Sequence, residues 1–398
     1  MATDGDIDYR SFTGAQLEDA LARIDRPNFP LNYARLTAAL AQHRAEQNAA
    51  SGREPLSRHQ LKFTGDGKEY FRIWIVNLAL SIATLGIYSA WAKVRKQRYF
   101  YSNTLLDGSA FGYHAEPLKI LKGRLIALLF VAAYFAAVRI SVVAALGVIV
   151  VIALLTPWLI VKSRIFTSRV SSWRGIRFNF RPDYRGAYTA LLGSMLLAIV
   201  SFGLMYPRVV YARYKFVVSR TSFGDAEFES SPRIGKFYRA YWTAVGVTAA
   251  VGALLGVVFT AFKGGLHTSD APRWVAQALA LGGLFLNYAI VGPVLLGIMH
   301  ARNLNEVLNH TTVGPHRLDG NLDATKLVGI YMTNVFLIIL TAGIYTPWAQ
   351  VRIARYRCES IALDANGPLA QLSAVPGAVV PGAALEELGS FFDLDFGF

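Results

Sequence analysis

The feature that most constrains this chain is a set of long apolar runs. They cover residues 71–92, 125–138, 142–161, 187–206, 242–262, 275–299 and 327–349. A straight helix needs about 20 apolar residues to cross the hydrocarbon of a bilayer, so most of these runs are long enough and the second is short. The chain is 54% hydrophobic and only 17% charged, whereas soluble domains carry roughly 25% charged residues. The sequence therefore predicts a polytopic membrane protein, mainly α-helical, and argues against a soluble domain.

Basic residues stand just outside the apolar runs. The net charge is +14, which in a soluble protein would suggest a nucleic-acid partner. Here, however, residues 93–124 and residues 162–185 each hold seven lysines and arginines beside an apolar run. This placement is typical of cytoplasmic loops that face anionic lipid. We therefore expect a multi-pass membrane protein, with anionic membrane lipids as partners and no nucleic acid.

Four regions are predicted along the chain. Residues 1–45 form a cytoplasmic segment of two short helices, because Thr13 and Gln16 make a capping box and Pro30 can open a second helix. Residues 46–60 are a polar linker, and residues 61–366 form the membrane domain. Residues 367–398, rich in alanine, glycine and proline, form a disordered tail. The acidic and aromatic end of this tail is expected to dock on the basic cytoplasmic face.

The membrane domain repeats itself. Residues 73–107 align without a gap with residues 330–364, and Trp91, Val94, Arg95, Arg98 and Tyr99 meet identical residues 257 positions later. Weaker copies of the pattern begin near Thr156, Ser201 and Val291. Short alternating segments with turn signals follow the copies, at residues 104–111, 171–178, 221–228 and 311–318. The fold class predicted is thus about five repeated units, each an apolar helix or helical hairpin followed by a small cytoplasmic β-hairpin.

Two topologies remain open. Seven straight crossings would place equally basic loops on opposite sides of the membrane, against the positive-inside rule. Alternatively, every unit is a helical hairpin that enters and leaves on the cytoplasmic side, with turns near residues 139–141 and 263–273 and at Gly86, Gly203 and Gly343. The glycine turns would then lie within the bilayer, which requires neighbouring protein to cover their backbone groups.

Three segments carry a family resemblance: FTGDGKEYFRIWIVN, TLGIYSAWAKVRKQRYFYSNTLLDGSAFGY and the tail FFDLDFGF. They make the chain similar to the YjgN family of bacterial inner-membrane proteins over most of residues 61–398. The resemblance implies an inner-membrane location and supplies no catalytic residues.

Candidate site residues come from the repeated motif. Three tryptophans precede a basic residue by one helical turn, which places an interfacial ring beside a charge that can hold an anionic lipid headgroup: Trp91 with Arg95, Trp158 with Lys162, and Trp348 with Arg352. Ordinary aromatic anchoring explains the same tryptophans. Asn77 and Asn334 form a possible intramembrane polar pair, although an interhelical hydrogen bond would also account for each.

No constellation for catalysis is visible in the sequence. His300, His310 and His316 lack the spacing of a metal site, and no nucleophile or phosphate-binding motif occurs. No cofactor, metal or enzymatic activity is therefore expected, and a lipid-modifying enzyme would lack a visible catalytic group. The expected function is a non-enzymatic membrane protein that engages anionic lipid, or a protein partner, through its cytoplasmic face. The alternative is a channel or uncoupled transporter with a path between repeat halves, lined by Asn77 and Asn334.

Overall fold

A computed structural model describes residues 12–24, 29–50, 57–265 and 273–367, with the single residues 7, 9 and 369. The chain divides into two compact units. One is Met1–Arg58 with Asp364–Leu369, and the other is His59–Leu363 with Ala370–Phe398.

The N-terminal unit is a helical pair, α1 (Gly14–Arg23) and α2 (Pro30–Ala50). The predicted capping box is present, and the Thr13 backbone N–H donates to Gln16 Oε1 at 2.9 Å. Leu17, Leu36 and Leu40 form its buried core. Helix α2 runs to Ala50, beyond the expected start of the linker, because residues 45–50 are good helix formers.

Three of the helix pairs in the larger unit are short. They are α3 (Gly67–Ala83) with α4 (Ser89–Ser102), then α7 (Tyr184–Ala187), η2 (Tyr188–Leu192) and α8 (Gly193–Val200) with α9 (Tyr206–Val218), and α12 (Ala324–Leu340) with α13 (Thr346–Glu359). Each pair turns at a glycine with positive φ: Gly86 at 91°, Gly203 at 87° and Gly343 at 93°. Each of these glycine N–H groups donates to a carbonyl five residues earlier at 2.7 Å. This bond satisfies a helix-end carbonyl, as in Schellman motifs, and reverses the chain within a few residues.

Aspartate caps the first helix of each short pair. Asp66 accepts from Lys68 N at 2.8 Å, Asp183 from Gly186 N at 2.8 Å and Asp323 from Lys326 N at 2.7 Å. The backbone donors at the start of α3 hold the pKa of the Asp66 carboxyl below its usual value. Capping by a carboxylate fixes where each of these helices begins.

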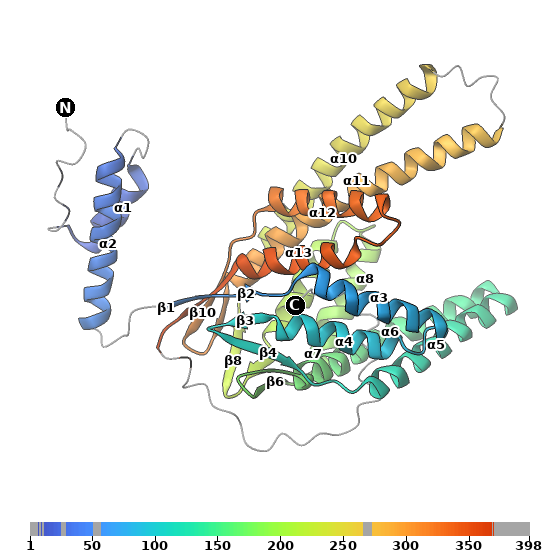
Figure 1. Ribbon diagram of the computed structural model, residues 1–398, viewed down its shortest axis with the longest axis horizontal. Helices are drawn as coiled ribbons and strands as arrows, with labels where there is room; N and C mark the ends of the chain where they lie inside the picture. Colours follow the sequence, from blue (N-terminus) through green and yellow to red (C-terminus); the bar gives the residue numbers. More distant parts are fainter. Residues whose placement is uncertain are drawn as a thin grey trace. The chain divides into compact units, whose positions relative to one another are not determined.

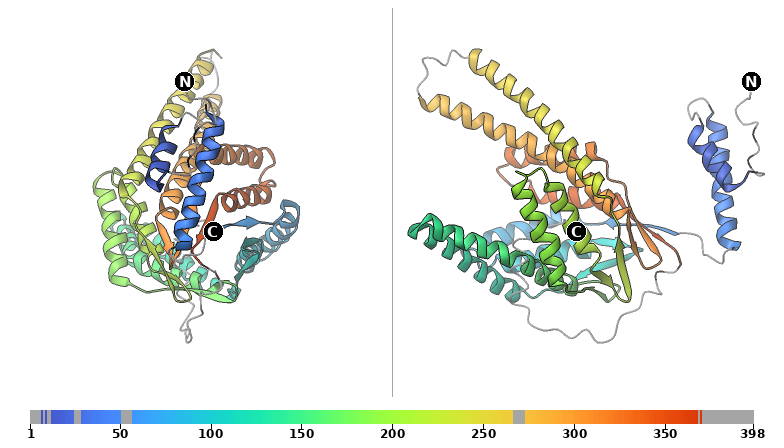
Figure 2. Two further views of the ribbon diagram at one scale, coloured as in Figure 1. Left: turned by 90° about the vertical axis from the view of Figure 1, so that its left-hand side faces the viewer. Right: turned by 180° about the vertical axis from the view of Figure 1, so that it is seen from behind.

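Two further helix pairs are long. They are α5 (Pro117–Ile140) with α6 (Val142–Val170), and α10 (Ile234–Gly265) with α11 (Arg273–Leu308). Ser141 separates the first pair and caps α6 by accepting from Ala144 N at 3.0 Å, as expected near residues 139–141. In the described part of the chain, three helices are long and apolar enough to cross a membrane: Pro117–Ile140, Val142–Val170 and Ile234–Ala261. The right-hand view in Figure 2 shows the long pairs reaching beyond the short ones.

One sheet of 11 strands closes nearly on itself. The strands are β1 (Ser57–Gln60), β2 (Lys62–Phe63), β3 (Thr104–Leu106), β4 (Ser109–Tyr113), β5 (Ser171–Trp173), β6 (Ile176–Phe180), β7 (Thr221–Phe223), β8 (Ala226–Ser230), β9 (Thr311–Val313), β10 (His316–Gly320) and β11 (Ile361–Ala365). Their order is β1-β11-β10-β9-β8-β7-β6-β5-β4-β3-β2. Because only Leu61 separates β1 from β2, the two edges of the sheet meet in one continuous segment. Leu61 N donates to Ile361 O at 3.0 Å and Thr64 N to Asn103 O at 2.9 Å, so both edges are paired.

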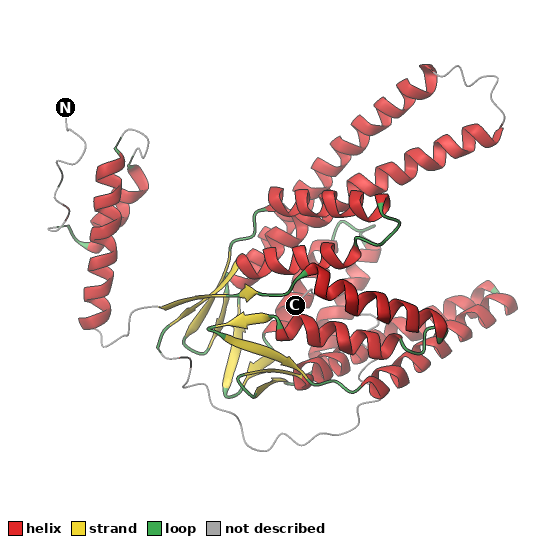
Figure 3. Cartoon of the chain, viewed as in Figure 1, coloured by secondary structure: helices red, strands yellow, loops and turns green. Residues whose placement is uncertain are grey.

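The helix pairs form a matching ring above the strands. Neighbouring pairs touch through α4 and α5, α6 and η2, α9 and α10, and α11 and α12, and the ring closes where α13 packs on α3. Helices α4, α6, α9, α11 and α13 each lead directly into a strand, and we call them the inner helices. In this unit the strands gather at one end and the helices extend from it (Figures 1 and 3). The sequence did not predict that the separate β-hairpins would join into one sheet.

Candidate functional site: paired arginines and a central chamber

The predicted lipid-binding arginines and the predicted asparagine pair meet in the structure. Arg95 Nη1 donates to Asn77 Oδ1 at 3.4 Å, and Arg352 Nη1 donates to Asn334 Oδ1 at the same distance. Both asparagines are buried and both arginines are exposed. Each arginine therefore stands at the surface of its own helix pair, oriented by a buried amide on the other helix. The two asparagines make these bonds within separate pairs and are not joined to each other.

A second contact orients each arginine. Arg95 Nη1 also donates to Tyr88 OH at 3.2 Å, and Arg352 Nη1 donates to Thr333 Oγ1 at 2.7 Å. Since a guanidinium has five N–H donors in a fixed fork, anchoring through Nη1 restricts the directions of the others. Such pre-organisation favours recognition of a phosphate or carboxylate from outside.

The tryptophans of the motif pack on aromatic neighbours. Trp91 stacks on Tyr88 with 6.1 Å between ring centroids, and Trp348 stacks on Tyr345 at 6.0 Å and on Phe71 at 5.0 Å. In the remaining tryptophan motif, the Lys162 ammonium lies 5.9 Å from the Trp158 ring centroid, within cation–π range. Trp158 and Lys162 thus contact one another directly, whereas Arg95 and Arg352 are held by polar groups.

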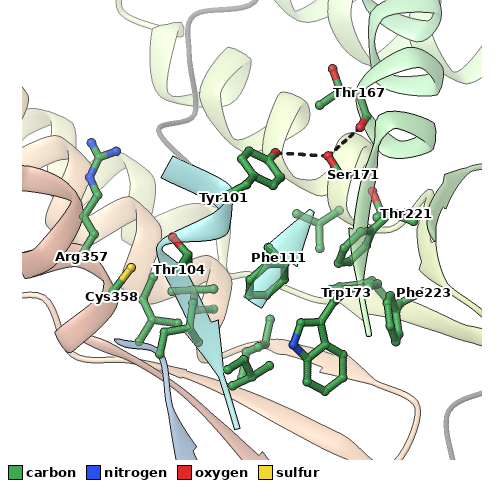
Figure 4. Close-up of a pocket in the computed structure, with 18 of the residues that line it drawn as sticks. Tyr101, Thr104, Phe111, Thr167, Ser171, Trp173, Thr221, Phe223, Arg357 and Cys358 are labelled. Atoms are coloured by element: carbon green, nitrogen blue, oxygen red, sulfur yellow. Dashed lines mark hydrogen bonds between the residues drawn. The ribbon is translucent and has the colours of Figure 1, made fainter. Parts of the chain in front are cut away.

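A central chamber, which the sequence did not predict, lies where the inner helices enter the ring of strands. Its volume is about 640 Å³. Each inner helix lines it with its last turns, through residues such as Gln97, Arg164, Tyr214, Leu304 and Ala354. The strands line it below these with the third residue of β3, β5, β7, β9 and β11, namely Leu106, Trp173, Phe223, Val313 and Leu363. Figure 4 shows side chains from several strands and helices pointing into this space.

Hydroxyl groups mark the boundary between helices and strands in the chamber. Thr104, Ser171, Thr221 and Thr311 each open a strand, and each donates to the carbonyl four residues earlier, at 2.6–2.9 Å. Ser171 Oγ also lies 3.2 Å from Tyr101 OH, and because the single serine proton goes to Thr167 O, the tyrosine hydroxyl donates here; both contacts are dashed in Figure 4. These bonds satisfy the last helical carbonyls, so the backbone changes from helix to strand without losing hydrogen bonds.

The charges that line the chamber are all positive. Among the described residues, the lining includes Lys96, Arg164 and Arg357 and contains no aspartate or glutamate. Arg357 Nη2 donates to Tyr331 OH at 3.0 Å, which fixes this guanidinium beside α12. Arg164 of α6 and Arg357 of α13 line the chamber together with Tyr214 of α9.

Sequence reasoning missed these chamber residues, although a signal was present. Arg357 follows Arg352 by five positions, which on a helix points to a different face. The repeated motif indicated only the helix face that carries a tryptophan and a basic residue one turn apart. The residues that line the chamber lie on a second face, in the last turns before each strand. The helical periodicity of those turns could have indicated this face.

The three histidines between residues 300 and 316 make separate contacts. His300 Nδ1 lies 3.0 Å from Tyr331 OH, and His310 Nδ1 lies 2.9 Å from the Glu306 carbonyl oxygen. His316 is buried on β10, and burial together with the charge of His59 lowers its pKa. Within the described residues, no group of three metal-ligating side chains is found.

Comparison with known proteins defines the family. Residues 58–390 match the family model described as "Bacterial protein of unknown function (DUF898)". The inner membrane protein YjgN of Salmonella typhimurium is 30% identical over 356 residues, which cover 76% of this chain and 87% of that protein. The chain therefore belongs to this family, as the resemblance in its sequence predicted.

Two further relatives match over a shorter stretch. The inner membrane proteins YjgN of Escherichia coli O157:H7 and of Escherichia coli K12 are 30% and 26% identical over 153 residues. That stretch spans 37% of this chain and 37% of each of those proteins. No solved structure matches the chain.

Proposed function

We propose that this protein is an integral protein of the bacterial inner membrane that binds anionic lipid headgroups on the cytoplasmic side and catalyses no reaction. The observation that carries the proposal is the geometry shared by Arg95 and Arg352. In two helix pairs, a buried asparagine accepts from Nη1 of an exposed arginine at 3.4 Å. A charge held in this way at a membrane surface suits a phosphate oxygen.

Membrane insertion is supported by apolar residues that the fold leaves uncovered. At the turns of two short pairs, Leu85 is 95% exposed and Phe202 is 98% exposed. Large side chains along α5 and α6 are exposed in the same way. Soluble proteins rarely expose contiguous apolar surface on this scale. Together with the location of the relatives, this supports lipid as the surrounding medium of the helix ring.

The single sheet supports a common-side topology. Every helix pair begins and ends at strands of one hydrogen-bonded sheet. A sheet cannot have its strands on both sides of a bilayer, so all five pairs would enter and leave on the sheet side. This arrangement favours five helical hairpins over seven straight crossings. We include in the proposal that these five units are internal repeats, each a helical hairpin followed by strands.

The basic residues near the sheet favour the cytoplasm as the side on which the sheet lies. A protein partner on the same face belongs to the proposal as well. A path between repeat halves, as a channel or uncoupled transporter would need, finds less support, because Asn77 and Asn334 bond to arginines within their own helix pairs.

Lipid analysis of purified protein tests the proposal. Replacement of both surface arginines, Arg95→Gln with Arg352→Gln, should lower the amount of co-purifying anionic phospholipid measured by mass spectrometry. The matched control is Arg181→Gln with Arg317→Gln, which removes the same charge from two exposed positions, one just after β6 and one on β10. Equal lipid content in both double variants would refute the headgroup sites.

A further inference from the structure

A second arginine lies beside Arg95 on the same face of α4. Arg98 follows Arg95 by three positions, and residues at this spacing are neighbours on a helix. Both side chains are exposed, and both line an open groove of about 440 Å³. Ile73 of α3 and Gly112 and Tyr113 of β4 also line this groove. The groove therefore lies where the first helix pair meets the sheet.

The groove presents hydrogen-bond donors at two levels. Helix α4 runs from the turn at Gly86 to the sheet, so Arg98 lies about 4.5 Å nearer the sheet than Arg95 along the helix axis. Arg98 Nη2 donates to Ala115 O at 3.5 Å, which ties this guanidinium to the segment after β4. Ser102, one turn further along α4, adds an exposed hydroxyl to the same groove. An anionic group held at Arg95 thus has a second binding position next to it on the sheet side.

The helices on either side of the groove expose apolar side chains. Ile75 and Val76 are exposed on α3, and Leu125 and Leu128 are exposed on α5, which packs on α4. Under the proposed function these surfaces face lipid, so acyl chains can lie on both flanks of the groove. The groove therefore suits a lipid that carries acyl chains on both sides of its headgroup.

The last unit repeats the two arginines but changes their neighbour. Arg352 and Arg355 are exposed there at the same spacing. Glu359, which is also exposed, stands where the first unit has Ser102. A carboxylate at this position repels an anionic group that approaches the arginine on the sheet side. The last unit therefore suits one phosphate, whereas the first unit suits two.

We propose that the groove of the first unit binds a phospholipid whose headgroup carries two phosphates, the chemistry of cardiolipin. One phosphate meets Arg95, as in the proposed function on which this inference rests. The other phosphate meets Arg98 and Ser102 on the sheet side. Basic pockets between membrane helices on the cytoplasmic side bind headgroups of this kind. Arg98 and Ser102 thus select the class of lipid, and the selection occurs in the first unit.

Native mass spectrometry of the full-length protein in detergent can test this selection, because it counts the lipids bound to each molecule. In titrations with cardiolipin and with phosphatidylglycerol, which has one phosphate, the unchanged protein should bind one cardiolipin at least about tenfold more tightly than any phosphatidylglycerol. This ratio is expected for one added charge-assisted contact. Arg98→Gln should bring the affinities for the two lipids to within about twofold of each other.

Exchanging the residue that differs between the two units gives matched variants. Ser102→Glu gives the first unit the residue of the last unit, so it should remove the preference for cardiolipin. Glu359→Ser makes the reverse change, so it should raise the number of tightly bound cardiolipins from one to two. This gain keeps the test decisive even if variants that lose lipid fold poorly. Arg181→Gln, an exposed charge outside the groove, should leave the preference within about twofold.

Several results would overturn the inference. The first is equal affinity of the unchanged protein for both lipids, and the second is an unchanged preference in Ser102→Glu or a single bound cardiolipin in Glu359→Ser. Displacement of cardiolipin by inorganic diphosphate at similar concentration would assign the groove to a soluble anion instead of a lipid. If any of these results occurs while Arg95→Gln with Arg352→Gln still lowers the co-purifying lipid, the proposed function stands and only the selection of cardiolipin is refuted.

Discussion

Two buried tyrosines should stabilise two helix pairs at the end nearest the sheet. Tyr99 OH donates to Asp66 O at 2.8 Å and accepts from Asp66 N at 2.8 Å. Tyr356 makes the same two contacts with Asp323, at 3.1 and 2.8 Å. Each hydroxyl joins the residue before the first helix of a pair to the inner helix that leads into the sheet. Both tyrosines are 6% exposed, so water cannot readily replace them.

The variants Tyr99→Phe and Tyr356→Phe remove only these hydroxyl groups. Each leaves the backbone N–H of the aspartate without its partner, while the aspartate carbonyl keeps the bond from the first turn of the helix; the cost is about 1–3 kcal/mol in the free energy of unfolding. An unfolding entropy near 2.1 cal/mol/K per residue over roughly 300 residues converts this into a fall of about 2–5 °C in Tm. Thermal unfolding in detergent, followed by circular dichroism, should show similar decreases for both variants.

The matched control is Tyr188→Phe, which deletes a hydroxyl from a side chain that is 37% exposed. Its Tm should change by less than about 1 °C, since surface substitutions fall within roughly 0.5 kcal/mol. If all three variants have the same Tm, the hydroxyl contacts contribute nothing to stability. Apolar packing alone then holds the helix pairs together at the end nearest the sheet. That outcome would refute the reasoning for both tyrosines at once.

Two further predictions concern the strand ring. In one, single cysteines are introduced at residues 107 and 174, with Cys358 replaced. Both should react with a membrane-impermeant reagent only when the reagent has access to the cytoplasmic side. Labelling of the two cysteines from opposite sides would favour seven straight crossings. Burial and the charge of His59 lower the pKa of His316, so the unfolded chain binds more protons than the folded one below the ordinary histidine pKa of about 6.5. Stability should therefore fall as pH drops below that value. The Tm of His316→Gln should depend less on pH than the Tm of the unchanged protein. If both depend on pH equally, His316 is not neutral in the folded protein.

The sequence by itself determined the apolar helices, their turns and the start of each β-hairpin. These features depend on local chemistry, which a single segment contains. A run of apolar residues, a glycine that adopts positive φ at Gly86 and the Asp107-Gly108 turn each specify their own conformation. The family could be recognised for the same reason, since its most specific motif is one continuous stretch.

Only the tertiary structure decided which segments meet. The closure of the sheet depends on Leu61 and Ile361, which are 300 residues apart, and no local pattern specifies that pairing. The same holds for the asparagines, each of which binds an arginine on the other helix of its own pair. The chamber likewise exists only because five inner helices and a ring of strands converge, so that residues unremarkable in their own segments become neighbours.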